Sequence, residues 1–581
     1  NTVGFEADGV HFYRVGGPVE FVVAGEELNS ATLRIVPVMV ALVGLTLFAL
    51  FRSVTVAAAA LLTVGVAVLW TLGALGWIGW AQNSLSQTLA PLILVIGVCD
   101  GIHLISSYAH ECAAHPPRGI GERRAALERV SADVGTPCVM TSLTTAAGFL
   151  SFATADLRSF VDYGIIAAIG VMFALVLSFS FLPLLLLRVQ PERIYVSRAS
   201  AVWERGLARL VTFADNRRQV ILACSVVLGI VCSLGMARLR VDSSFEELYG
   251  TQSRVVRWAH FASRHLRKPD ALEVDLQLPP DAALEAPATL AGIGRIAHDL
   301  SGIAPLGKAH TVLDLLAQTR RLAFGEAAGG DGAAADAEEN AALLGLASEM
   351  GSGRLSRWVD AAHRHVRISI ASEKLPQDVL RRVMAQVRRY LHALPPGWRG
   401  TATGPLALVS DMLDAIRTTQ LRSFAAAAAA VAALLALYLR SITWTALALF
   451  PTALPVVVTL GVMGWMNLPL DIGSAMVAAV VLGIAVDDII HLLHHIRCSR
   501  RAGQPLDLAV RTTIRRVGQP VVTTSVALTI GFAALILSPW RSVASFGLVS
   551  AIAIAGALVA DLLVLPALMF VMAGTSHTRA A

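Results

Sequence analysis

Two adjacent carboxylates stand in the middle of a long apolar run, VVLGIAVDDIIHLLHHI, at residues 480–496. A charged side chain at the centre of a bilayer costs about 2.5–3.5 kcal/mol on insertion scales, so Asp487 and Asp488 call for a functional reason. Side chains three or four residues apart share one face of a helix, which brings His491 within reach of both acids. This pattern favours a proton relay or ion coupling over a pair of acids that only orient helices.

The composition is that of a polytopic membrane protein. Hydrophobic residues make up 55% of the 581 and charged residues only 15%, whereas soluble domains are about 25% charged. The net charge of +6 comes from arginines in loops between apolar segments, so it does not indicate nucleic-acid binding. All 6 cysteines lie in or beside apolar segments, so neither a disulfide framework nor a zinc finger is predicted.

Eleven apolar segments have about the 20 residues that a helix needs to cross a bilayer. Arginines gather in three of the loops between them, 109–136, 188–218 and 497–518, and the positive-inside rule predicts that these loops are cytoplasmic. The polar region 240–415 is then expected outside the cytoplasm. The segments are 34–51, 55–77, 88–108, 137–154, 161–187, 219–237, 420–439, 443–465, 472–496, 519–537 and 543–573.

The spans define the predicted domain order. We expect the end of a first extracytoplasmic domain, a first transmembrane half with five spans, a cytoplasmic linker, and the first span of a second half. A second extracytoplasmic α+β domain, the remaining five spans and a cytoplasmic tail follow. In that order, the bounds are 1–33, 34–187, 188–218, 219–237, 238–418, 419–573 and 574–581.

The two halves are related by a parallel repeat. A shift of 388 residues aligns Gly73, Gly76, Trp77, Asp100 and His103 with Gly461, Gly464, Trp465, Asp488 and His491. Beyond the next loop, a shift of 383 aligns Pro137, Ser142, Gly148 and Ser178 with Pro520, Ser525, Gly531 and Asp561. Each half therefore has an aspartate three residues before a histidine. Asp487 is an addition of the second half, where the first half has Cys99.

The repeat also predicts what precedes the first transmembrane half. The stretch GGPVEF near the start resembles TGPLAL at the end of the polar region, so residues 1–33 match the end of that region. We therefore expect a preceding piece with one more span and most of another extracytoplasmic domain. The complete architecture would have two halves of six spans, of which eleven spans are visible.

The polar region reads as a small α+β domain, of a βαβ type. The segments 271–278 and 365–371 alternate like strands, whereas 287–300 and 376–394 are predicted helices. The low-complexity segment 326–342 is predicted to be flexible. Histidines of the polar region such as His310, His363 and His365 are scattered, so no metal site is predicted there.

The candidate proton-relay residues are Asp100, Asp487, Asp488, His103 and His491. Hydroxyl groups on the following span of each half, including Thr141 and Ser142, are suited to hydrogen-bond across helices. The motif HLLHH at 491–495 lies at a span end beside Arg497, which favours an interfacial helix end over a metal site. The supporting candidates are Thr144, Thr145, Thr524, Ser525 and Asp561.

The segments GIAVDDIIHL and GVCDGIHL, each followed by a span like TSLTTAAGFLSF, resemble the resistance–nodulation–division (RND) superfamily. The resemblance is to its MMPL and sterol-sensing-domain-related exporters. It implies twelve spans, two porter-like periplasmic domains, and proton entry coupled to export of hydrophobic substrates. It also implies that Asp100, Asp487 and Asp488 are the relay acids of the fourth and tenth spans. Much of the MMPL branch has Asp-Tyr at this place, so the departure here leaves open which acid of the tenth span carries the proton.

We therefore expect a proton-driven exporter of lipids or other amphiphiles in a bacterial inner membrane, which needs the proton gradient but no cofactor or metal. The alternatives are a non-transporting lipid sensor or scaffold, like a sterol-sensing domain, and a proton-driven accessory of protein export. An enzyme is not expected, because no nucleophile–base set occurs. A homo-oligomer or a periplasmic partner is compatible with this function, and the substrate stays open among lipids, triterpenoids, polyketides and drugs.

Overall fold

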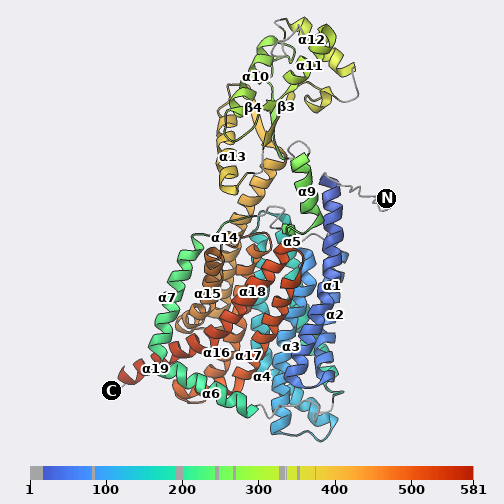
Figure 1. Cartoon of the computed structure of the whole chain (residues 1–581). Helices are drawn as coiled ribbons and strands as arrows, with labels where there is room; N and C mark the ends of the chain where they lie inside the picture. Colours follow the sequence, from blue (N-terminus) through green and yellow to red (C-terminus); the bar gives the residue numbers. More distant parts are fainter. Residues whose placement is uncertain are drawn as a thin grey trace. The chain divides into compact units, whose positions relative to one another are not determined.

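A computed structural model describes residues 17–80, 85–189, 200–242, 248–265, 270–325, 334, 336–349, 354–372 and 375–579 (Figure 1). The chain divides into two compact units. The larger, helical unit comprises Gly17–Val256 and Ala415–Ala581, and the described part of the smaller unit lies within Arg257–Asp414. Each unit is described separately below.

Ten stretches of the described residues are helical, long and apolar enough to cross a membrane. The chain is therefore a multi-pass membrane protein, as its composition predicts. The helices are α1 (Gly17–Phe51), α2 (Val54–Ile78), α3 (Leu89–Ala114), α5 (Arg158–Leu186), α7 (Arg218–Met236), α14 (Gly404–Leu439), α15 (Ile442–Trp465), α16 (Val477–Arg501), α17 (Leu506–Ala534) and α18 (Arg541–Val559), which continues through a π-helical turn, η8 (Ala560–Val564), into α19 (Leu565–Arg579).

The predicted span 137–154 is helical but is not among these ten. It forms the second part of α4 (Ile120–Leu150) and the 3-10 turn η2 (Ser151–Thr154). Hydroxyl residues lower the hydropathy of this segment, and they are buried because α4 packs between α5 and α16. The hydroxyl side chains of this segment thus face the interior of the helical unit.

The halves contact each other through two repeat-related helix crossings. At Gly148 of α4, a Cβ atom would lie 2.9 Å from the carbonyl oxygen of Ala479 on α16. At Gly531 of α17, a Cβ atom would lie 2.7 Å from Val95 on α3. Since Gly148 and Gly531 are repeat counterparts, small residues bring α4 and α17 close to the opposite half in the same way.

Shorter elements complete the description. The amphipathic helix α6 lies before α7, and α9 precedes the first strand. Their bounds, with those of the remaining described helices and 3-10 turns, are α6 (Ser200–Asn216), α9 (Arg254–His265), α11 (Val312–Phe324), α12 (Ala337–Glu349), η1 (Ser86–Thr88), η5 (Leu355–Arg357), η6 (Ser474–Met476) and η7 (Leu535–Leu537).

The smaller unit contains a four-stranded antiparallel sheet in the order β2-β3-β1-β4. Helices α10 and α13 bury leucine, isoleucine and valine side chains against it. The order makes two split βαβ units, β1-α10-β2 and β3-α13-β4, which confirms the predicted strands and helices. The bounds are β1 (Asp270–Gln277), α10 (Pro287–Ser301), β2 (Ala309–His310), β3 (His365–Ser372), α13 (Gln377–His392) and β4 (Arg399–Thr403).

The predicted flexible segment 326–342 lies mostly outside the described residues. From Ala337 it is helical, as the start of α12, so the prediction was wrong for that part. Acidic residues Glu338 and Glu339 in the first turn suit a helix N-terminus, which explains why this low-complexity stretch becomes helical.

Candidate functional site

The two repeat-related acids each accept a hydrogen bond from a serine on the next span. Asp100 on α3 accepts from Ser142 Oγ on α4 at 3.0 Å. Asp488 on α16 accepts from Ser525 Oγ on α17 at 2.6 Å, and from Thr524 Oγ1 at 3.2 Å. Both acids are buried. Because Ser142 and Ser525 are repeat counterparts, the aspartate–serine pair is duplicated as a unit.

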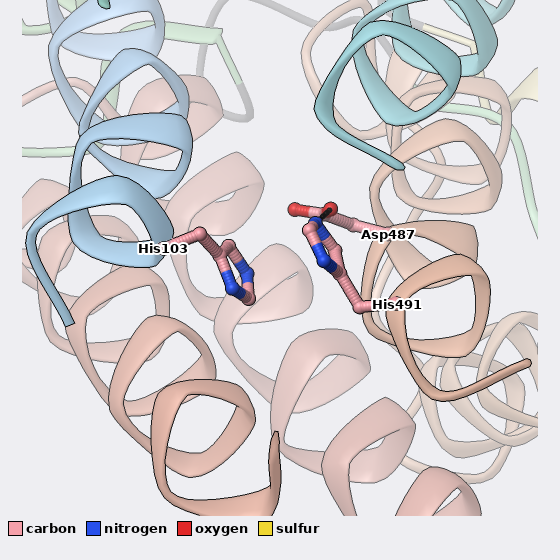
Figure 2. Close-up of side chains that lie close together, drawn as sticks. All are labelled: His103, Asp487 and His491. Carbon is pink, nitrogen blue, oxygen red and sulfur yellow. Dashed lines mark ion pairs between the residues drawn. The ribbon is translucent and has the colours of Figure 1, made fainter. Parts of the chain in front are cut away.

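The repeat-related histidines meet each other across the two halves. The rings of His103 and His491 stack with centroids 3.8 Å apart and planes 7° apart (Figure 2). The expected proximity of Asp100 and His103 within one half does not produce a hydrogen bond, since Asp100 is turned to Ser142 and His103 Nε2 has no partner among the described residues. The helix spacing alone could not predict this, because the stack forms between halves.

Asp487 faces a different partner from its neighbour Asp488. Its Oδ1 lies 3.7 Å from His491 Nε2, one turn away on the same helix (Figure 2). That oxygen has no hydrogen-bond partner among the described residues. Adjacent helical residues point about 100° apart, so Asp487 turns to the histidine pair and Asp488 turns to α17. The helical spacing had placed His491 within reach of both acids. In the structure, Asp487 alone of the two lies beside it.

A cavity of about 20 Å³ lies between the acids of the two halves. This volume holds about one water molecule, and its walls are polar enough to bind one. Cys99 lines it, at the position that matches Asp487 in the repeat. Asp100 of α3 and Asp487 of α16 thus line the same small polar cavity. The polar lining residues are Asp100, Asp487, Thr141, Ser142 and Thr145.

The remaining supporting candidates of α4 serve the helix contacts. Thr145 Oγ1 donates to the Gly483 carbonyl of α16 at 3.2 Å, whereas Thr144 Oγ1 donates to the Thr141 carbonyl within α4 at 2.8 Å. Neither hydroxyl bonds to a relay acid in these contacts. Cys138, which the sequence did not single out, has its Sγ 3.9 Å from His491 Nε2. In the sequence, the one signal for Cys138 is its position one helical turn before Ser142.

The donor atoms of His103, Asp487 and His491 lie within 4.8 Å of one another, which raises the question of a metal ion (Figure 2). Imidazole lone pairs lie in the ring plane, so the lone pairs of two parallel rings lie in parallel planes. A bound zinc ion needs nitrogens that converge at about 2.0–2.1 Å from one point. The stacked rings do not meet this need, so the arrangement fits a titratable cluster better than a metal site.

The HLLHH motif lies near the C-terminal end of α16, at the arginine-rich side of the helical unit. His494 Nδ1 lies 2.7 Å from the hydroxyl oxygen of Tyr438, and Arg497 donates to the Tyr438 carbonyl at 3.5 Å. In the smaller unit, His365 Nδ1 lies 3.0 Å from Asp275 Oδ1. His494 and His365, which lie outside the stacked pair, thus each have a polar side-chain partner.

Asp561 stands apart from the other supporting candidates. It lies in the π-helical turn η8, with 1% of its surface exposed, and neither of its carboxylate oxygens has a hydrogen-bond partner among the described residues. The structure therefore brings Thr524 and Ser525 onto a relay acid but leaves Asp561 unpaired.

Comparison with known proteins finds a family, a relative and a solved structure that resemble this chain. The model of the MMPL family matches residues 7–218 and 356–580. A membrane protein of Methanocaldococcus jannaschii is 32% identical over 197 residues, which cover 34% of this chain and 51% of that protein. The hedgehog release protein Disp of the water bear Hypsibius dujardini has a similar fold, with a TM-score of 0.69 and 13% identity over 94% of this chain and 71% of that one.

Proposed function

The chain belongs to the MMPL family, whose members are membrane transporters, and from this premise we propose that it is a proton-driven exporter of lipids or other amphiphiles. In this proposal the membrane is a bacterial inner membrane, the arginine-rich loops are cytoplasmic, and the α+β unit lies outside. The RND-type duplicated helical fold supports the transporter class. The chain spans about half of the length of the archaeal relative, so its substrate is part of the proposal.

The observation that carries the proposal is the duplicated aspartate–serine pair beside the stacked histidines. Intramembrane acids in a bundle interior are typical of proton pathways. When Asp100 or Asp488 is ionised, its serine donates a hydrogen bond to it, and protonation removes the need for that donor. A proton thus changes the contact between α3 and α4, or between α16 and α17.

The same helices carry the contacts between halves, which links protonation to movement. α4 touches α16 at Gly148, and α17 touches α3 at Gly531. A change in the aspartate–serine contacts would shift α4 and α17 against the opposite half, so the two halves would rock about the histidine stack. Such a shift requires that protons bind one arrangement of the halves better than the other.

Single Asn variants of Asp100, Asp487 and Asp488 test the relay in the full-length protein. We expect each to reduce proton-driven lipid transfer by about 100-fold, as for other proton-transfer residues. Vesicles made from a total lipid extract would receive an imposed pH gradient, and mass spectrometry would identify lipids that reach acceptor vesicles. A protonophore is the control. Three variants that transfer lipid at the unmodified rate would refute the proton relay.

The same assay separates the competing functions. A lipid sensor or scaffold would copurify with lipid but show no transfer that depends on the pH gradient. An accessory of protein export would move protons only when an exported polypeptide is present. Transfer of lipid in the absence of any polypeptide therefore favours the exporter over both.

A further inference from the structure

Asp561 is a buried acid that the relay described above does not use. It is 1% exposed, and both carboxylate oxygens are without a partner among the described residues. An ionised carboxylate without donors in an apolar interior is strongly disfavoured. Asp561 therefore carries a proton in this arrangement of the helices, whereas Asp100 and Asp488 have hydroxyl donors that stabilise their ionised forms.

Two features that only the second half possesses coincide at this residue. The repeat counterpart of Asp561 is Ser178, which is also buried and has an unpartnered hydroxyl. Ser178 lies within the regular helix α5, whereas Asp561 lies in the π-helical turn η8. π-helical turns often mark functional sites, because the wider turn frees a backbone carbonyl and re-aims a side chain. The second half thus gained both an acid and a local distortion at one position.

Asp561 and Asp488 stand at similar positions along their helices, counted from the arginine-rich side of the helical unit. Nine residues, about 13 Å of helix, separate Asp561 from Phe570, whose carbonyl accepts from Arg218 and whose ring lies under Arg511. Nine residues also separate Asp488 from Arg497. Each acid is therefore nine positions along its helix from a residue at the arginine-rich side, Phe570 for Asp561 and Arg497 for Asp488.

The acids of α16 are the charged groups that act on Asp561. Burial is the largest influence on its carboxyl group, and the charges of Asp488 and then Asp487 follow it. The turn η8 packs against α6, α7, α15, α18 and α19. On α6 and α7, Asp215 and Arg218 pair with each other at 3.7 Å, and Asp215 also pairs with Arg511. These charges are thus paired with one another at the arginine-rich side of the helical unit.

We propose that Asp561 is a proton-carrying residue of the second half, which exchanges its proton with Asp488. The step takes place when the helices leave this arrangement: the proton leaves the Asp561 carboxyl oxygen and binds the Asp488 carboxylate, so one negative charge moves from Asp488 to Asp561 and no other reactant is consumed. The second half then holds three linked carboxyl groups, whereas the first half holds Asp100 alone. This inference rests on the proposed proton relay.

The protonation of Asp561 can be measured without any substrate. Infrared spectra of the full-length protein in lipid vesicles report protonated carboxyl groups through their carbonyl stretch. At neutral pH, Asp561→Asn should remove one carboxyl contribution, and Ser178→Ala, the matched control, should leave the band unchanged. An Asp561→Asn band equal to that of the unmodified protein would overturn the proposal.

Transport tests whether the proton moves. In the lipid-transfer assay, we expect Asp561→Asn to lower proton-driven transfer at least about tenfold and Asp561→Glu to restore most of it. The double variant of Asp561→Asn with Asp488→Asn should be no slower than Asp488→Asn alone, because both residues act on one route. A merely structural role predicts additive losses and an unchanged pH profile, and this result would overturn the inference.

The two proposals fail in different ways. If Asn at Asp100, Asp487 and Asp488 leaves lipid transfer unchanged, the proposed function falls. If those variants lose transfer and Asp561→Asn keeps both its rate and its pH profile, only the role of Asp561 falls.

Discussion

At the scale of single residues, the two adjacent acids of α16 have separate tasks because they point to separate partners. Asp488 is held by hydroxyl groups of α17, and its counterpart Asp100 is held in the same way. Asp487 Oδ1 has no hydrogen-bond partner among the described residues and lies beside His491. Like charges this close titrate as a coupled group. Asp487 therefore faces the histidine pair, whereas Asp488 belongs to the duplicated aspartate–serine pair.

A substitution of one stacked histidine separates its proton chemistry from its packing. His103→Phe keeps a flat ring against His491 but removes both nitrogens, so we expect a stable protein whose proton-driven lipid transfer is reduced by about 100-fold. Thermal unfolding monitored by tryptophan fluorescence in detergent gives the stability, and the vesicle assay gives the transfer rate. His103→Ala serves as a control that removes the ring as well. Normal transfer by His103→Phe would show that the imidazole carries no proton.

At the scale of helices, the repeat makes the same motif serve different contacts in the two halves. On α15, Gly461 and Gly464 pack closely on α7 at Gly235, and Trp465 Nε1 donates to the Val231 carbonyl at 3.0 Å. On α2, no described atom outside the helix lies within 4 Å of a Cβ placed at Gly73 or Gly76, and Trp77 is 93% exposed. Small residues allow close helix approach only where a partner helix is present.

A leucine at the crossing of α7 and α15 should disrupt it. A Cβ at Gly464 would overlap the Gly235 carbonyl oxygen, so Gly464→Leu must push the helices apart. Overpacking of this kind costs about 1–3 kcal/mol, which we expect as a lower unfolding temperature in lipid nanodiscs. Gly76→Leu, at the repeat counterpart, meets nothing described and is the matched control. Equal stability of the two variants would contradict the assigned crossing.

At the scale of the whole molecule, the helical unit is two related halves whose interface holds the candidate site. Each half contributes one acid with its serine and one histidine, and α4 and α17 reach across to the other half. Because both halves contribute side chains to this site, its geometry changes when either half moves. This placement suits a transporter in which both halves change position together.

The proposed orientation predicts which side of the membrane exposes Cys498. This exposed cysteine lies at the arginine-rich end of α16, and the positive-inside rule places that end in the cytoplasm. A membrane-impermeant maleimide should label it in inverted vesicles but not in intact cells. The Cys498→Ser variant shows which label belongs to this residue. Labelling of Cys498 in intact cells would reverse the proposed topology.

The sequence alone was sufficient for the features that depend on local pattern. Hydropathy marked the membrane helices, alternation marked the strands β1 and β3, and the two shifts paired Asp100 with Asp488 and Ser142 with Ser525. These signals survive because burial in lipid and the two-residue period of a strand act on neighbouring residues. The segment 137–154 was also predicted as a span, but its hydroxyl residues, which face protein and not lipid, keep it out of the ten sufficiently apolar helices.

Only the tertiary structure decided which of these residues touch. His103 and His491 stack although 388 positions separate them, and the sequence had paired each with an acid of its own helix. The split of Asp487 and Asp488 between two partners, the small cavity that faces both halves, and the π-helical turn at Asp561 also depend on how the helices pack. Helical spacing specifies the face on which a side chain lies, whereas the opposing face is supplied by a helix far away in the chain.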